Sequence, residues 1–145
     1  MSKSIKFKNN TYIDSSSISH KRQLLNSILE TKTIYDSGSN SNGSWIRFNE
    51  GTMICYGTRT FSIVADYAVG AVFYNQNGVS IGLGNYPISF IDTPICVLGG
   101  GSGSLNYIEH NYSGGTSIGW CWFFNPTKRT QQTIRVSFIA IGKWK

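Results

Sequence analysis

Residues 43–57 of this 145-residue chain carry the pattern of one β-hairpin, which constrains the fold more than any other feature. Two runs rich in β-branched and aromatic residues flank Asn49-Glu50-Gly51. A three-residue loop that ends in glycine is typical of a type I turn followed by a left-handed bulge. Glycine suits this last position because it has no Cβ to clash at positive φ. The sequence therefore predicts a strand on each side of the loop.

Both faces of the predicted hairpin carry large apolar side chains. If Phe48 pairs with Thr52, alternation along the strands assigns every side chain to one face or the other. One face has Ile46, Phe48, Ile54 and Tyr56, and the other has Trp45, Arg47, Met53 and Cys55. A solvated face would not need Trp45 and Met53. We therefore expect both faces to be covered, either by a second sheet or by neighbouring subunits.

The chain after this hairpin predicts more short strands and no second helix. The expected strands are Arg59–Ala65, Ala68–Tyr74, Val79–Leu83, Ile95–Leu98, Leu105–Tyr112, Ser117–Phe124 and Thr133–Ile141. Asn77-Gly78 is a two-residue hairpin signal, and Pro94 marks a strand start or an edge because proline cannot donate to a ladder. Short strands with turns at regular spacing favour an all-β fold, an antiparallel β-sandwich.

A change of composition divides the chain into residues 1–36 and residues 37–145. The stretch Asp36–Gly43 is rich in Ser, Gly and Asn, as in a flexible linker or an exposed loop, so we place the boundary there. The first part is expected to be an N-terminal attachment or oligomerisation segment. The second part is expected to be the β-sandwich head.

The N-terminal segment predicts a short hairpin followed by a short helix. Ser4–Lys8 and Thr11–Asp14 alternate like paired strands around the turn signal Asn9-Asn10. A helix is predicted over 19–31, with Ser19 as its N-cap. Its apolar stripe consists of Leu24, Leu25, Ile28 and Leu29. Because such a helix is marginal alone, the stripe must pack on the main domain, on symmetry mates or on another component.

The last predicted strand has two unlike faces. One face is apolar throughout, whereas the other changes from Arg135 and Ser137 to Ile139 and Ile141. This change would expose an apolar patch on a monomer, so we expect the strand end, together with Trp144, to be buried in a homo-oligomer. The alternative is that a loop or the N-terminal helix folds over the patch.

Composition and charge exclude several classes of function. Thirteen Lys and Arg against seven Asp and Glu give a formal charge of +6, which favours acidic partners. The basic residues gather near both ends without a nucleic-acid-binding motif, so solvated charge is the better interpretation and no nucleic-acid partner is expected. The sequence has neither an apolar run long enough to span a bilayer nor a signal peptide, which predicts a soluble protein made in a cytoplasm without membrane insertion.

The three cysteines, Cys55, Cys96 and Cys121, each lie in a strand-like run and form no CxxC cluster. Buried free thiols are the favoured interpretation, and a disulfide between Cys96 and Cys121 cannot be judged from spacing. A metal site lacks the ligands it would need. We therefore expect neither a metal nor a cofactor.

Two of these patterns together resemble the C-terminal receptor-binding head of bacteriophage and prophage tail-fibre proteins. They are the hairpin at 43–57 and the terminal run Phe138–Lys145. The proline-containing stretches Tyr86–Phe90 and Thr93–Val97 are similar to the middle of such heads. Ile5–Ser15 is similar to segments that precede heads in prophage tail proteins of Gram-positive hosts.

This resemblance implies an H-type-lectin-like homotrimer of β-sandwich heads at the distal end of a fibre or baseplate. Such a protein is made in the bacterial host cytoplasm, resides in the virion tail and acts at the host cell surface. Its implied partners are other tail or baseplate proteins and a host cell-surface saccharide, which it binds noncovalently. The first rival hypothesis is a structural tail-assembly module without glycan binding.

The second rival, a polysaccharide hydrolase, finds little support in the sequence. It would need a pair of carboxylates at a defined separation, and no two of the seven acidic residues form a recognisable motif. Neither His20 nor His110 lies near a serine or cysteine nucleophile motif. The run Gly99–Gly103 lacks the Lys-Ser/Thr of a phosphate-binding loop. We therefore do not expect an enzyme.

The candidate ligand-binding residues cluster around the loop at 113–116. They are Tyr107, His110, Asn111, Tyr112, Trp120 and Trp122. Aromatic rings match the C–H faces of sugars, while Asn, His and Tyr can bind hydroxyl groups. Trp120 and Trp122 share one strand face, and a core position is the competing interpretation for both.

Loops on a rigid sandwich are the other expected place of contact. The loops at 99–104 and 111–116 are the best candidates, since loops on such scaffolds usually carry function. Arg59, Lys128 and Arg129 could add attraction to anionic wall glycopolymers, although solvated charge is the simpler interpretation.

Overall fold

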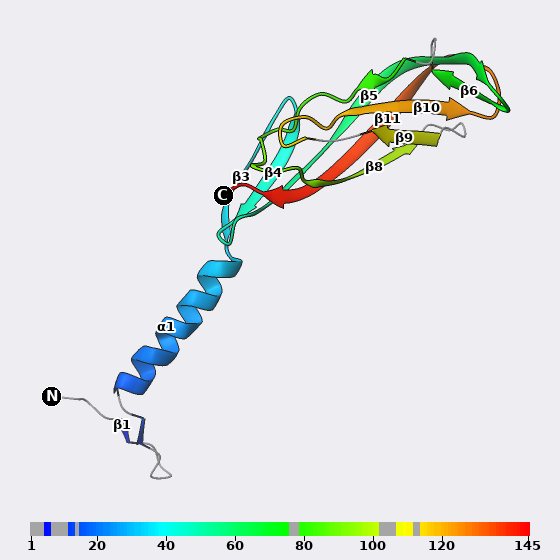
Figure 1. Cartoon of the computed structure of the whole chain (residues 1–145). Helices are drawn as coiled ribbons and strands as arrows, with labels where there is room; N and C mark the ends of the chain where they lie inside the picture. Colours follow the sequence, from blue (N-terminus) through cyan, green and yellow to red (C-terminus); the bar gives the residue numbers. More distant parts are fainter. Residues whose placement is uncertain (1–4, 7–11, 14, 76–78, 102–106, 112–113) are drawn as a thin grey trace.

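The computed structural model describes residues 5–6, 12–13, 15–75, 79–101, 107–111 and 114–145. A small hairpin and a helix precede a β-rich head, and the helix extends away from one end of that head (Figure 1). The hairpin pairs β1 (Ile5–Lys6) with β2 (Tyr12–Ile13), as the sequence predicts. Its predicted turn at Asn9-Asn10 lies outside the described residues.

The helix α1 spans Ser15–Lys32 and so begins four residues before the predicted N-cap. Serine costs a helix only a few tenths of a kcal/mol more than lysine or arginine, so the run Ser15–Ser17 can be helical. The side chains of the apolar stripe, Leu24, Leu25, Ile28 and Leu29, are all about half exposed. The head of the same chain therefore does not cover them.

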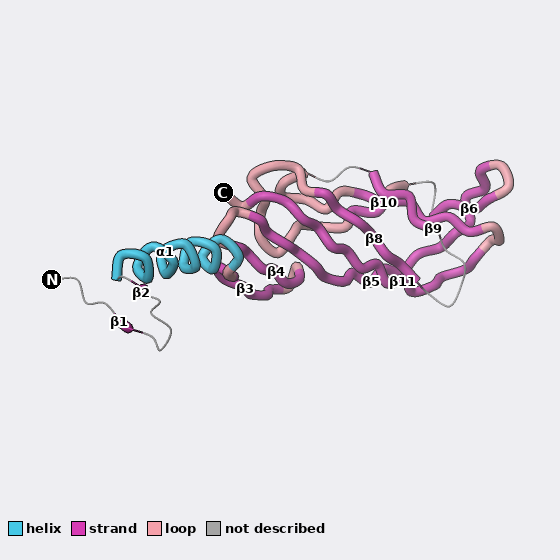
Figure 2. Tube along the Cα trace, turned by 90° about the horizontal axis from the view of Figure 1, so that it is seen from below, coloured by secondary structure: helices cyan, strands magenta, loops and turns pink. Residues whose placement is uncertain are grey.

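Nine strands build the head. They are β3 (Ile34–Asn40), β4 (Gly43–Phe48), β5 (Thr52–Val69), β6 (Val72–Asn75), β7 (Ile81–Gly82), β8 (Ile95–Gly101), β9 (Tyr107–Asn111), β10 (Trp120–Asn125) and β11 (Arg129–Lys143). Every pairing among them is antiparallel. The strands run along the long axis of the head, and α1 continues beyond its end (Figure 2). The predicted all-β class is confirmed.

The sheet folds over itself into two layers. The first layer has the order β3-β4-β5-β11-β8, and the second has β6 and β7 on one edge of β10 and β9 on the other. The long strand β5 joins them, because its outer part pairs with β6. The core lies between the layers, where Met53 and Cys55 of β5, Val136 of β11 and Phe123 of β10 are almost fully buried.

The hairpin that opens the head agrees with its prediction in turn and register. Gly51 has a φ of 94° and its N–H donates to the Phe48 carbonyl at 3.0 Å. Ile46 pairs with Ile54, and Arg47 with Met53. One face, with Met53 and Cys55, is buried in the core. The opposite face leaves Tyr56 exposed, so within one chain only one side of the hairpin has a cover.

Two local predictions are wrong. The stretch expected to be a linker forms β3 and the following turn, and the boundary placed after residue 36 falls inside this strand. Polar residues suit this edge strand, and the absence of a side chain at Gly38 leaves room for the Trp45 ring. The predicted break near residue 66 is a bulge within the continuous β5, and the chain turns instead at Gly70, which has a φ of 59°.

All three cysteines are free thiols, with Cys55 and Cys121 buried and Cys96 partly buried. Burial raises the pKa of both Cys55 and Cys121 to about 11, since a thiolate would lose its hydration in the core. The expectation of buried free thiols is therefore confirmed for two of the three. No helix among the described residues is long and apolar enough to cross a membrane.

Candidate functional site

Strand β10 presents large aromatic side chains to both sides of its layer. Cys121 and Phe123 point into the core and have no exposed surface. Alternation then places Trp120, Trp122 and Phe124 on the outer side. The side chain of Trp120 is 50% exposed. The alternative interpretation of Trp120 as a core residue is therefore excluded within this chain.

The neighbouring strands add an aromatic ring and polar groups beside these three residues. Tyr74 of β6 stacks on Phe124, with ring centroids 5.6 Å apart and planes 26° from parallel. On the other edge, Asn111 pairs with Trp120 and Glu109 pairs with Trp122, so these two polar residues of β9 share the outer side. We call this surface the aromatic face, defined by Tyr74, Glu109, Asn111, Trp120, Trp122 and Phe124.

The aromatic face has the chemistry that a hydroxylated ligand needs. Its rings offer flat apolar surface for C–H groups, the Asn111 amide can donate and accept hydrogen bonds, and the Glu109 carboxylate can accept them. Gly82 pairs with Trp120 on the far edge of β10, and a Cβ there would lie 3.7 Å from the indole ring. The ring of Trp120 therefore lies beside a strand position that has no side chain.

The six sequence-predicted residues do not all come together. Asn111, Trp120 and Trp122 share the aromatic face, whereas His110 pairs with the buried Cys121 and so lies on the opposite side of β9. The ring Nε2 of His110 is 2.7 Å from the Ile118 carbonyl oxygen, a contact that fixes a neighbouring loop. Tyr107 pairs with Phe124 through its backbone. Tyr112 lies outside the described residues.

Sequence reasoning missed Glu109, Tyr74 and Phe124. Phe124 could have been found, because it follows Trp122 at the two-residue spacing that places strand residues on one face. The positions of Tyr74 and Glu109 depend on strand pairing, and the pairing of β6 with β10 crosses about fifty residues of chain.

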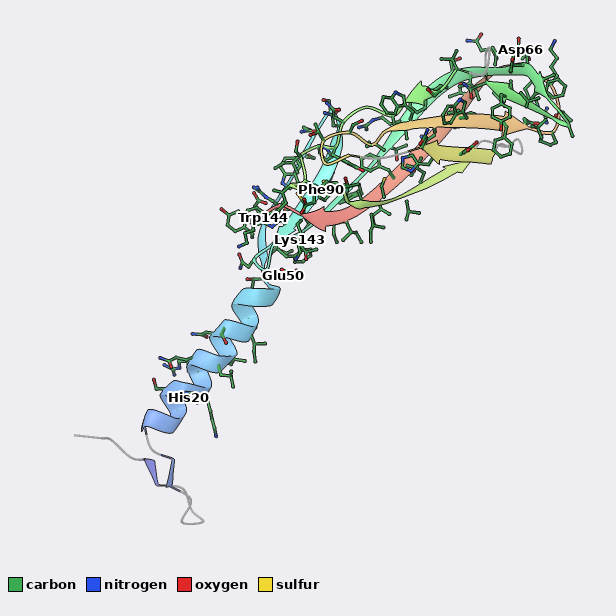
Figure 3. The ribbon with its side chains drawn as sticks, viewed as in Figure 1. His20, Glu50, Asp66, Phe90, Lys143 and Trp144 are labelled. Atoms are coloured by element: carbon green, nitrogen blue, oxygen red, sulfur yellow. The ribbon has the colours of Figure 1, made fainter. Side chains whose placement is uncertain are left out.

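The two loops expected to make contacts lie at opposite ends of β9. One follows β8, which ends at Gly101 beside Arg135, and its residues 102–106 lie outside the described residues. The other follows Asn111, and its Gly115 carbonyl accepts from the Phe90 N–H at 2.8 Å. Phe90 lies near the helix end of the head, while Asp66 marks the far end (Figure 3).

The three basic residues predicted to attract anions also differ in role. Lys128 and Arg129 are exposed, and Arg129 pairs with Ala65 beside Asp66 at the far end of the head. Arg59 is partly buried, and its guanidinium donates to the carbonyl oxygens of Leu83, Asn42 and Asn85 at 2.8–3.2 Å. Burial lowers the pKa of Arg59. Arg59 therefore connects the loop at Asn42 to the segment at Leu83 and Asn85.

The outer side of the first layer carries a second unusual surface. Cross-strand rows bring together Ile95 with Ile141 and Ile54, and Val97 with Ile139 and Tyr56. Five of these side chains are exposed, and Ile95 is exposed to 76%. We call this surface the aliphatic face, defined by Ile54, Tyr56, Ile95, Val97, Ile139 and Ile141. Nothing in the described part of the chain covers it.

Trp144 makes its contacts within its own chain, away from the aliphatic face, and its burial with the strand end in a homo-oligomer stays a prediction. Its Nε1–H donates to the Phe48 carbonyl at 3.0 Å, and its ring lies 4.7 Å from that of Tyr35. The Arg47 guanidinium lies 4.8 Å from the Trp144 ring and pairs with the Asp36 carboxylate. We call Tyr35, Asp36, Arg47 and Trp144 the basal clamp, because they contact one another and Trp144 lies at the end of the head from which α1 extends (Figure 3).

Within the described residues, no group of three or more His, Cys, Asp and Glu side chains could hold a metal ion. The acidic residues of the head are also dispersed. Asp36 is in the basal clamp, Glu50 in the first hairpin turn, Asp66 at the far end, Asp92 in the loop beside Gly115 and Glu109 on the aromatic face.

Comparison with known proteins finds likeness only among solved structures. No family model and no curated protein matches the chain. One matching structure is the R1 pyocin fibre of P. aeruginosa comprising C-terminal residues 323–701, with 14% identity, 74% of this chain covered and a TM-score of 0.46. The chain spans 28% of that fibre. Another is an N-truncated R1-type pyocin tail fibre, with 13% identity, 94% of this chain and 99% of that one covered, and a TM-score of 0.49.

Proposed function

We propose that this chain is the receptor-binding head of a phage or prophage tail fibre, which binds a host cell-surface glycan noncovalently as a homotrimer. The observation that carries the glycan-binding part is the half-exposed Trp120 on an outer sheet face, with Trp122 beside it and Asn111 paired to it. The tail-fibre role follows from the sequence resemblance, and the binding role follows from this surface.

The side chains of the aromatic face are better suited to contact with a glycan than to contact with water. Exposed Trp is costly to leave solvated, because its ring carries a large apolar area. A sugar ring covers that area with C–H groups and directs its hydroxyl groups to the sides, where Asn111 and Glu109 lie. Stacking on an aromatic ring contributes on the order of 1 kcal/mol, so a glycan that spans two rings gains more than one that reaches a single ring.

The homotrimer is supported by two apolar surfaces of one chain. The aliphatic face of the head and the stripe of α1 are both exposed, and both are of the kind that a soluble monomer rarely leaves open. A second copy supplies the same aliphatic surface in a symmetric assembly, without any further partner. Three copies, rather than two, follow from the resemblance to tail-fibre heads. The stripe of α1 then packs between parallel helices of the same trimer.

The direct test is titration of the purified chain with cell-wall polysaccharide of candidate hosts. The wild-type protein should bind at least one polymer reproducibly, and Trp120→Ala should weaken that binding at least about tenfold, equivalent to about 1.4 kcal/mol. Tyr35→Ala is the matched control, because Tyr35 is an exposed aromatic residue of the basal clamp, away from the aromatic face. Equal binding by Trp120→Ala and wild type would refute the assignment of the aromatic face.

The same titration separates the rival functions. A structural assembly module would bind none of the host polymers, whatever the state of Trp120. A hydrolase would release new reducing ends during prolonged incubation, and we expect no release.

A further inference from the structure

Aromatic side chains continue from the aromatic face onto the far end of the head. Tyr74 of β6 pairs with Phe124 on one edge and with Tyr67 of β5 on the other. Paired residues share one side of a sheet, and Asn75, the residue after Tyr74, is buried on the core side. Tyr74 and Tyr67 therefore both lie on the outer side. The side chain of Tyr67 is 48% exposed, almost as much as that of Trp120.

Five rings thus form one track over three strands. The track follows β10 to the far end of the head, where β6 and then β5 lie beside it (Figure 1). We call it the aromatic ribbon, defined by Trp120, Trp122, Phe124, Tyr74 and Tyr67. Alternate residues of a strand are about 6.7 Å apart and neighbouring strands about 4.8 Å apart, so the ribbon is about 23 Å long.

Strand pairing holds the rings of the ribbon in place. At its far end the chain turns at Gly70, which has a φ of 59°, and Val69 pairs with Val72 beside this turn. In its middle the Tyr74 ring stacks on Phe124. A ligand therefore meets a surface that is already ordered, so binding requires little loss of conformational freedom in the protein.

Polar groups flank the ribbon on the β9 edge, and their charge limits the kind of ligand. Asn111 pairs with Trp120 and Glu109 pairs with Trp122, and both polar side chains are exposed. None of the described residues that form or flank the ribbon in these strand pairings is cationic. An acidic polymer would bring its charge beside the Glu109 carboxylate without gaining a cationic partner, which is unfavourable. The ribbon therefore suits a neutral polymer with hydroxyl groups.

We propose that the aromatic ribbon binds an internal stretch of a linear, neutral polysaccharide, whose sugar chain lies along the ribbon towards the far end of the head. The inference rests on the proposed function, because it names the class of glycan and extends the aromatic face to Tyr67. A sugar ring is similar in size to one aromatic side chain, so a single unit would leave most of the ribbon uncovered. Successive units of a chain cover successive rings, and only such a ligand contacts both half-exposed ends, Trp120 and Tyr67.

The test measures how affinity depends on the length of the sugar chain. The probes are fragments of the host polymer that the wild-type protein binds, produced by partial acid hydrolysis and separated by length. Calorimetric titration of the full chain should give an affinity that rises from one unit to at least about three units, because each further unit reaches another ring. Equal affinity for single units and for long fragments would show that the face binds one unit only, and the proposal would be wrong.

A change at the far end of the ribbon locates the long ligand. Tyr67→Ala should weaken binding of long fragments about fivefold and leave binding of single units unchanged. Tyr67→Phe is the matched control, since it keeps the ring and should bind both kinds of fragment like the wild type. Equal binding of long fragments by Tyr67→Ala and wild type would overturn the proposal, while weak binding by Trp120→Ala would still support the proposed function. A changed mass of Tyr67→Ala in light scattering would show that Tyr67 contacts another copy, and would also overturn the proposal.

The dependence on salt tests the neutral character of the polymer. Affinity for a neutral chain should be the same in about 0.05 M and about 0.5 M sodium chloride, since salt screens only interactions between charges. A polymer held by the formal charge of +6 on the protein would instead dissociate as the salt concentration rises, and this result would overturn the neutral class. If the wild-type protein binds no host polymer of any length, the proposed function is itself refuted, and the proposal fails with it.

Discussion

The two outer faces of the sandwich differ in chemistry although one strand network builds both. The aliphatic face consists mainly of β-branched side chains, such as Ile139 and Val97, that lie in rows across three strands. The aromatic face pairs Trp120 and Trp122 with an amide and a carboxylate. A flat aliphatic surface can be matched well by another protein surface, whereas rings beside polar groups match a ligand that is apolar and hydroxylated at once.

Unlike the aromatic face, the aliphatic face covers only part of the outer side of its layer. Its rows of Ile and Val end where Ser137 pairs with Thr58, and the two hydroxyl oxygens there are 3.2 Å apart. Toward the far end the same side of the sheet continues with Arg135 and Thr60, which are exposed. The contact between copies is thus expected near the helix end of the head, continuous with the stripe of α1.

The largest effect is expected from a charge on the aliphatic face. Ile139→Lys should convert the homotrimer into a monomer, because burying an unpaired ammonium group at a subunit contact costs several kcal/mol. Light scattering at micromolar concentration measures the change. Ser137→Lys is the control, since it places the same charge two residues along the same side, beyond the aliphatic rows.

A trimeric mass for Ile139→Lys would show that the aliphatic face is not the contact. A monomeric mass for both Ile139→Lys and Ser137→Lys would show that the contact extends over the hydroxyl-rich part. A monomeric wild-type protein would refute the homotrimer itself.

A smaller effect distinguishes two neighbouring residues of β9 on opposite sides of the second layer. Asn111→Ala should weaken glycan binding several-fold with an unchanged free energy of unfolding. His110→Ala should lower the free energy of unfolding by about 1 kcal/mol through loss of the contact with the Ile118 carbonyl, without a direct effect on stacking. Calorimetric titration and urea unfolding of both variants measure the two quantities. Swapped outcomes would contradict the face assignment.

The sequence predicts those parts of the fold that depend on neighbouring residues and misses those that depend on strand pairing. The first hairpin is predictable in register because its turn requires Gly51 at positive φ and its flanking residues are β-branched or aromatic. The strand β3 is not, because serine, glycine and asparagine carry no strand preference, and it forms only because β4 offers a paired edge. Likewise, the sequence predicts that a strand ends at Ala65, but β5 continues beyond it through a bulge.

The candidate site shows the same division. Trp120 and Trp122 share a face by alternation alone, and the structure agrees. The side on which His110 lies depends on the register between β9 and β10, and a shift of one residue would place it on the other face. The contacts of Trp144 within its own chain could not be predicted for a similar reason, since its partners Tyr35 and Phe48 are remote in sequence.

Two thiols test whether both layers are equally well packed beneath their faces. Cys55 lies under the first layer and Cys121 under the second, and burial raises the pKa of each from 9.0 to about 11. The unfolded thiol ionises first, so this contribution to stability is present below about pH 9 and is lost as the pH rises towards 11. The free energy of unfolding of the wild type, measured with urea, should therefore fall more over that range than that of Cys55→Ala or Cys121→Ala. In a Cys96→Ala background, reaction of only Cys55 or only Cys121 with a disulfide reagent in the native protein would identify the looser layer.

The smallest effect is expected in the basal clamp, which lies outside both faces and so supplies a baseline for comparing them. The Arg47 guanidinium donates to the Asp36 carboxylate and so lowers the pKa of that carboxyl group from its usual value. A lowered carboxyl pKa stabilises the fold above the unfolded value, and this contribution is lost as the pH falls through the acid range. Arg47→Met keeps the apolar stem against Trp144 but removes the ion pair with Asp36. The free energy of unfolding of this variant should therefore depend less on pH between about 6 and 3 than that of the wild type. The mass of the assembly and glycan binding at neutral pH should not change. A change in the mass of the assembly would show that the basal clamp is coupled to the aliphatic face, and a change in glycan binding would show that it is coupled to the aromatic face. Either result would mean that the two faces are less separate than their chemistry suggests.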